Sequence, residues 1–111
     1  MKQLSGPDLI GMSTAAGAPM PLLLDVREPW EVAVAAIALP AATTRSIPMR
    51  EVPARLAELD PAQPVLCICH HGARSAQVVA FLERAGFPSA YNLAGGIDAW
   101  SRDVDPGVTR Y

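Results

Sequence analysis

Features that would commit the chain to a membrane, to nucleic acid or to a disulfide framework are scarce in this sequence. Its 111 residues include only two cysteines, Cys67 and Cys69, and a pair one residue apart cannot staple a fold of this size. The net charge of −2 provides no overall attraction to nucleic acid or to a membrane surface. No uncharged run reaches the roughly 20 apolar residues that a spanning helix needs, and the run from Val32 to Thr44 also contains Pro40. We therefore expect neither membrane insertion nor nucleic-acid binding, and any anion site must be local.

The N-terminal residues MKQLSGPDLIG contain one lysine and no continuous apolar segment, which argues against a secretory signal. With 50% hydrophobic and 18% charged residues, the composition is typical of a soluble globular protein. The length fits a single domain over residues 1–111. We expect a cytoplasmic monomer without a cofactor, in which the cysteines are reduced thiols.

Two continuous apolar runs bounded by turn residues predict strands that are buried on both faces: PLLLDV, residues 21–26, and PVLCIC, residues 64–69. The second run leads through a short polar loop into RSAQVVAFLERAG, which has apolar residues at helical spacing and Gly86 in the position of a C-terminal cap. This succession predicts a strand, a tight loop and a helix.

Other segments continue the alternation of strands and helices. Pro29 favours a helix start within residues 27–38, and apolar spacing predicts a helix over 49–60, with Pro53 in its opening turn. We expect a short strand at 89–93, a glycine turn into a terminal helix at 95–100, and a loose loop at 13–19. Trp30 and Trp100 are expected to pack helices against the sheet. The pattern predicts an α/β fold with a mostly parallel sheet covered on both faces.

The most informative stretch is CICHHGARS, residues 67–75, which holds both cysteines and both histidines of the chain. In parallel sheets, sites lie beyond the C-terminal ends of the strands. Cys69 ends one predicted strand, and Asp25 and Arg27 end the other. The stretch therefore lies where chemistry is expected.

A metal site and a redox pair are weaker interpretations of this stretch. Structural zinc sites usually recruit a second ligand pair from a distant segment, and none is present, so we expect no metal. A disulfide between Cys67 and Cys69 would close a very small ring in an extended segment. Cys67 is interpreted as a small buried core residue.

A nucleophile in an anion cradle fits the stretch better. Gly72 and Ala73 allow the backbone to curl so that successive N–H groups point inward above a helix N-terminus. These groups, the helix dipole and Arg74 favour the thiolate form of Cys69, which is the reactive form.

On these residues the chain resembles the rhodanese family of sulfurtransferases, in its small single-domain form. The similar segments are LLLDVREPWE at 22–31, IPM at 47–49, CHHGARS at 69–75 and YNLAGGIDAW at 91–100. The chain departs from the family at 36–42, where AIALPAA stands in place of a common histidine- and glycine-containing segment. The resemblance implies a three-layer α/β domain around a central parallel five-stranded sheet flanked by helices.

The resemblance also implies that Cys69 becomes a persulfide, with the active loop running through His70, His71, Gly72, Ala73 and Arg74. The expected reaction moves a sulfane sulfur from a small anionic donor such as thiosulfate to cyanide, a thiol or a protein acceptor. Phosphatases with this fold have a loop one residue longer, so a phosphatase or arsenate reductase is disfavoured. A persulfide carrier and a non-catalytic binding module remain alternatives.

Further residues are expected to support this loop. The backbone N–H groups as far as Ser75 should stabilise the thiolate and the persulfide. Arg74 could hold the loop or face the donor. Asp25 is expected to anchor the loop and Arg27 to attract the donor, the alternative for both being a surface ion pair.

Overall fold

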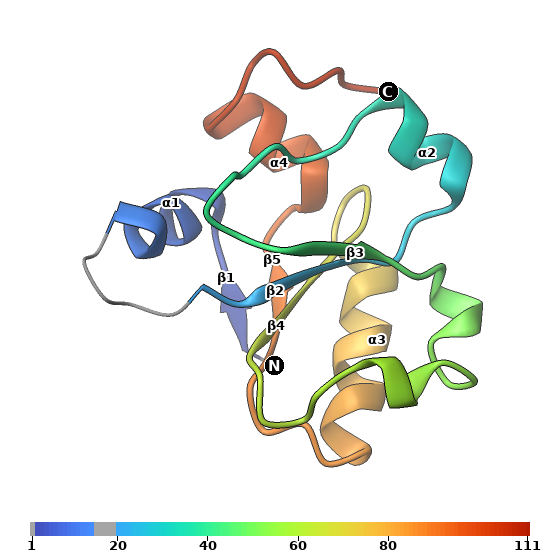
Figure 1. Cartoon of the computed structure of the whole chain (residues 1–111). Helices are drawn as coiled ribbons and strands as arrows, with labels where there is room; N and C mark the ends of the chain where they lie inside the picture. Colours follow the sequence, from blue (N-terminus) through green and yellow to red (C-terminus); the bar gives the residue numbers. More distant parts are fainter. Residues whose placement is uncertain (1, 15–19) are drawn as a thin grey trace.

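The computed structural model describes residues 2–14 and 20–111. Its five strands form one sheet: β1 Gln3–Leu4, β2 Leu22–Asp25, β3 Thr44–Ser46, β4 Val65–Ile68 and β5 Ala90–Leu93. Their order across the sheet is β1-β5-β4-β2-β3, and every neighbouring pair is parallel (Figure 1). The parallel five-stranded α/β fold expected from the sequence is therefore confirmed.

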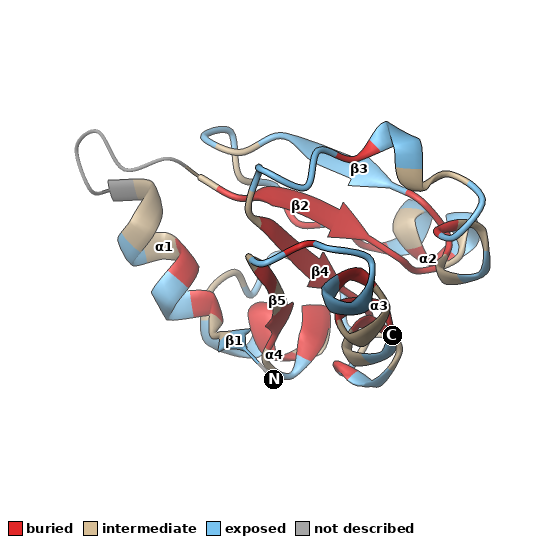
Figure 2. Ribbon diagram, turned by 90° about the horizontal axis from the view of Figure 1, so that it is seen from below, coloured by how far each residue is buried: buried red, intermediate tan, exposed pale blue. Residues whose placement is uncertain are grey.

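The central strands are buried on both faces because their side chains alternate between two cores. Leu22, Leu24 and Val26 belong to one apolar cluster, whereas Leu23 belongs to the other. All four residues of β2 and of β4 are buried (Figure 2). This explains why both strands appear in the sequence as continuous apolar runs rather than alternating ones.

Helices cover both faces of the sheet and give three layers. The first cluster packs β2 and β4 against α3 Ala73–Arg84 and the short 3-10 helices η1 Met49–Glu51 and η2 Leu56–Glu58. The second cluster packs the opposite face against α1 Gly6–Thr14 and α4 Gly96–Asp103. The helix α2, Pro29–Val34, follows the C-terminal end of β2.

Two expectations about helices need correction. The segment 49–60 is not one helix but η1 and η2, joined by turns. Pro53 lies between them, and a proline inside a helix removes a hydrogen bond and clashes with the preceding turn. The helix that begins at Pro29 ends at Val34, because Ala35 has extended backbone angles.

The tryptophans also differ from expectation. Trp100 is 2% exposed in the second core, as predicted, but Trp30 is 63% exposed and does not pack α2 against the sheet. Of the predicted loop at 13–19, residues 13 and 14 belong to α1 and the rest lies outside the described residues. No helix in the described part of the chain has the length and apolarity to cross a bilayer.

Candidate active site at the end of strand β4

The candidate nucleophile lies directly after β4, at the base of the loop that leads into α3. Two donors reach its sulfur: the Gly72 N–H at 3.1 Å and the Ser75 hydroxyl at 3.2 Å from Cys69 Sγ. Gly72 has a φ of +108°, so the chain reverses there at a residue that tolerates the left-handed region. Both donors favour negative charge on the sulfur, which is the electrostatic feature expected of a reactive thiol.

A side chain from β5 supports the inner side of this loop. Asn92 is 3% exposed, and its Nδ2 donates to the Gly72 carbonyl at 3.1 Å. That bond orients the amide so that Oδ1 faces the Ser75 hydroxyl and accepts a hydrogen bond from it. The Ser75 hydroxyl has one proton and two acceptors, Asn92 Oδ1 and Cys69 Sγ, so it can transfer its donation to the sulfur when the sulfur becomes negative.

The N-terminus of α4 holds the loop from another direction. The Ile97 N–H donates to the Cys69 carbonyl at 2.9 Å, and the Asp98 N–H donates to the His70 carbonyl at 3.1 Å. Gly96 approaches so closely that an added Cβ would lie 2.4 Å from the His70 carbonyl oxygen. The glycine turn before α4 therefore also permits a close contact with the active loop.

Arg74 is held by a carboxylate. Its Nη1 and Nη2 donate to Glu31 Oε1 and Oε2 at 2.6 and 2.8 Å, and its side chain is 33% exposed. Glu31 is 4% exposed on α2, and the bond from Arg74 is the main reason why its pKa falls to about 2. In this structure Arg74 therefore holds the loop to α2, which is one of the two roles that the sequence left open.

Asp25 and Arg27 form a buried ion pair and not a surface one. Arg27 is 0% exposed, and its Nη2 lies 2.7 Å from Asp25 Oδ2 and 2.7 Å from the Ala35 carbonyl oxygen. The expectation that Arg27 attracts a donor is not supported, because no part of Arg27 reaches solvent. Asp25 accepts hydrogen bonds from Arg27, so it braces the end of β2 and the chain after α2.

The two histidines form part of an aromatic stack on the outer side of the loop. The rings of His70 and His71 stack at 3.9 Å, and Tyr111 stacks on His70 at 4.0 Å with 8° between the planes. Burial is the main reason why the pKa of His70 lies below its ordinary value. Trp30 meets Tyr111 edge to face at 6.1 Å.

Potential ligand atoms of His70, His71 and Asp98 lie within 4.8 Å of one another. The imidazole planes are stacked 3.9 Å apart and only 24° from parallel, so their lone pairs lie in nearly parallel planes and not in the converging arrangement of a tetrahedral zinc site. The Asp98 carboxylate accepts two hydrogen bonds from Arg110. A metal would need these three side chains to rearrange.

The second cysteine belongs to the core, as expected. Cys67 is 0% exposed, and burial raises the pKa of its thiol to about 12. It is therefore a neutral apolar residue at ordinary pH.

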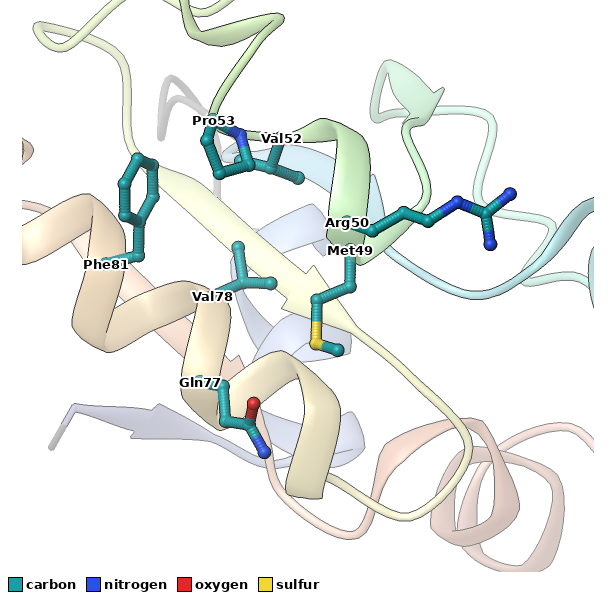
Figure 3. A pocket seen from close by; sticks show the side chains of 7 residues that line it. All are labelled: Met49, Arg50, Val52, Pro53, Gln77, Val78 and Phe81. Atoms are coloured by element: carbon teal, nitrogen blue, oxygen red, sulfur yellow. The ribbon is translucent and has the colours of Figure 1, made fainter.

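Two cavities lie on the α3 side of the sheet, and Arg74 of the loop lines one of them. One of about 230 Å³ is lined by Val26, Glu28, Met49, Arg50 and Arg74. The other, of about 270 Å³, lies between η1 and α3 and is mostly apolar (Figure 3). Cys69 lines neither of these two cavities.

Three residues that contact the loop or its partners are not predicted from the sequence: Glu31, Asn92 and Tyr111. In the sequence, Glu31 is distinguished only as the last residue of the family-like segment 22–31. Asn92 had a usable signal, because a polar residue inside a short buried strand needs a hydrogen-bond partner. Tyr111 gave no signal.

A model of the family described as "Rhodanese-like domain" matches residues 9–103. The chain belongs to the rhodanese-like domain family. A sulfurtransferase of Allochromatium vinosum is 41% identical over 87 residues, which cover 78% of each chain. Thiosulfate sulfurtransferase GlpE of Actinobacillus pleuropneumoniae is 41% identical over 56 residues, about half of each chain.

The fold agrees with solved rhodanese-like structures. A rhodanese-like domain protein from Staphylococcus aureus superposes with a TM-score of 0.80 at 29% identity, over 100% of this chain and 99% of that one. The chain matches only 30% of the length of a chloroplast Rhodanese-like/PpiC domain-containing protein from Arabidopsis thaliana. The rhodanese-like domain thus occurs both as a chain of this size and within larger proteins.

Proposed function

We propose that this rhodanese-like chain is a sulfurtransferase in which Cys69 carries the transferred sulfur as a persulfide. The observation that carries the proposal is the pair of donors at Cys69 Sγ, the Gly72 N–H and the Ser75 hydroxyl. Donors placed where charge develops in the reaction are usually the largest contribution to catalysis.

The first half-reaction is attack by the Cys69 thiolate on the outer sulfur of a donor. With thiosulfate, a bond forms between Sγ and the outer sulfur, the S–S bond of the donor breaks, and sulfite leaves with the electron pair. The Ser75 hydroxyl donates a hydrogen bond to Cys69 Sγ while the sulfur is negative, and it donates to Asn92 Oδ1 instead when the sulfur is neutral, keeping its proton throughout.

In the second half-reaction a nucleophilic acceptor takes the outer sulfur, and the electron pair of the breaking bond returns to Cys69 Sγ. Cyanide gives thiocyanate, and a thiol gives a new persulfide. No general base is required, because a thiolate attacks sulfur directly. Thiosulfate is supported as the donor by the name of the Actinobacillus relative, which matches half of this chain.

The surroundings of the loop bear on the choice of donor. The arginines that border it are paired with carboxylates, Arg74 with Glu31 and Arg50 with Glu28. Recognition of a donor anion therefore depends on the loop N–H groups, on the part of Arg74 that is exposed, and on His70 and His71 when they are protonated.

We further propose that residues 1–111 act as one monomeric domain in a reducing cytoplasm. Strand β1 pairs with β5, and Val104, Val108 and Tyr111 pack against the second core. Residues on both sides of the range 9–103 that matches the family therefore contribute to the fold. Light scattering coupled to size exclusion tests the monomer, and a dimer mass would contradict it.

The function is tested by following thiocyanate release from thiosulfate and cyanide, with Cys69→Ser and Cys67→Ser as the matched variants. The proposal requires turnover by the wild type and by Cys67→Ser and none by Cys69→Ser. Full activity of Cys69→Ser would overturn it.

A further inference from the structure

Tyr111 brings together parts of the site that come from different elements. The segment 104–111 leaves α4 and ends beside α2 (Figure 1). The phenol oxygen accepts a hydrogen bond from Arg27 Nη1 at 2.8 Å and donates one to Glu31 Oε2 at 2.8 Å. Its ring stacks on His70 and meets the edge of Trp30.

The hydroxyl connects the two ion pairs of the site. Glu31 Oε2 accepts from both Tyr111 and Arg74 Nη2, so the phenol helps to fix the carboxylate that orients Arg74. On its other side, the phenol is held by Arg27, which is itself immobilised by Asp25. A rigid link therefore runs from the end of β2 through Tyr111 to the last residue of the active loop.

The ring acts on the other end of the loop. His70 directly follows the nucleophile, and its imidazole lies between the rings of His71 and Tyr111. His70 Nε2 is buried and has no hydrogen-bond partner among the described residues, and the rings of His71 and Tyr111 stack on the imidazole. The α4 N-terminus fixes the carbonyl of the same residue.

We propose that Tyr111 is a positioning residue for the persulfide loop, acting on Arg74 through its hydroxyl and Glu31, and on His70 through its ring. This proposal rests on the proposed sulfurtransferase function, because sulfur transfer is what the loop is proposed to do. It predicts two separable effects, because phenylalanine keeps the ring and removes only the hydroxyl.

The ring contact has an electrostatic signature. Burial lowers the pKa of His70 and is opposed by a backbone hydrogen bond with Tyr111 and by the charges of Asp98 and Glu31, while His71 acts in the same direction as burial. The phenol is neutral near pH 7, because its ordinary pKa is about 10 and burial raises the pKa further. Removing the ring exposes the imidazole, so the pKa of His70 should rise.

The test compares the wild type with Tyr111→Phe, Tyr111→Ala and the control Tyr91→Phe, which changes the other tyrosine of the chain, on β5. Histidine ring signals are titrated by NMR, and a His71→Gln variant assigns the two of them. The kinetic constants kcat and KM for thiosulfate are measured at pH 7, at a temperature where melting curves show every variant to be folded.

We expect Tyr111→Phe to lower kcat about tenfold, the effect of losing the hydrogen bond to the charged Glu31 carboxylate, while the pKa of His70 stays unchanged. Tyr111→Ala should lower kcat at least as much and also raise the pKa of His70. Tyr91→Phe should match the wild type in all three.

Two results would overturn the proposal. Wild-type kcat in Tyr111→Phe would show that the hydroxyl does not position Arg74, and an unchanged His70 titration in Tyr111→Ala would show that the ring does not control His70. If the wild type transfers no sulfur, the proposed function fails, but the His70 titration and the NMR signals of the Arg74 guanidinium still decide whether Tyr111 sets the loop.

Discussion

Glu31 offers the most quantitative check of the site, because its charge is buried and has several partners. The carboxylate accepts two hydrogen bonds from Arg74, one from Tyr111 and one from the Glu28 N–H. A carboxyl whose pKa falls from 4.5 to about 2 on folding stabilises the folded state by about 3 kcal/mol at neutral pH. Arg74 is one-third exposed, so solvent screens part of this, and we expect Glu31→Gln to cost about 2 kcal/mol.

The dependence on pH follows from the direction of the shift. Because the pKa is lowered on folding, the stabilisation is complete above the unfolded value of 4.5 and is lost as the pH falls toward about 2. The difference in unfolding free energy between the wild type and Glu31→Gln should therefore shrink by about half between pH 7 and pH 3.

Urea unfolding followed by circular dichroism at both pH values measures this difference, with Glu58→Gln as the control. Glu58 is paired with Arg45 and Arg55 at the surface, where an ion pair contributes only about 0–1 kcal/mol. A Glu31→Gln variant as stable as the wild type at pH 7, or a difference that does not change with pH, would refute the reasoning.

Three further predictions concern the loop and the tryptophans. Ser75→Ala removes a donor at the nucleophile, and stopped-flow measurement should show sulfur loading about tenfold slower; an unchanged rate would exclude a role for the hydroxyl. Gly96→Ala should lower the free energy of unfolding measured in urea by about 2 kcal/mol or more, because the new Cβ would clash with a loop carbonyl. Gly86→Ala has open space around it and should cost about 1 kcal/mol. Trp100→Ala should cost about 3–5 kcal/mol and Trp30→Ala less than about 1, and equal losses would contradict the burial of the two rings.

The sequence predicted those parts of the fold that depend on local pattern. Strands β2 and β4 were recognisable because both faces are apolar, and α3 because its apolar spacing ends at Gly86, which has a φ of +96°. The prediction of one helix over 49–60 is wrong because the apolar spacing suits a helix there, while Pro53 interrupts the backbone hydrogen bonds. Periodicity alone does not weigh these two effects against each other.

The sequence predicts the local contacts of the candidate site but not the distant ones. Cys69, Gly72 and Ser75 belong to one strand, loop and helix start, so their proximity follows from the chain itself. The partners of the loop come from far away: Glu31 lies 43 residues before Arg74, and Tyr111 lies 80 residues after Glu31. Only the packing of α2 and of the segment 104–111 onto the loop brings these groups together.

The central claim is that Cys69 carries the transferred sulfur, and intact-mass measurement tests it most directly. Purified wild type, Cys67→Ser and Cys69→Ser are incubated with thiosulfate, and the mass of each intact protein is measured by mass spectrometry before and after cyanide is added. The account predicts that the first two gain one sulfur atom and lose it to cyanide, while Cys69→Ser gains none. A sulfur atom retained on Cys69→Ser, or no gain on the wild type with thiosulfate or with a low-molecular-weight persulfide, would contradict it.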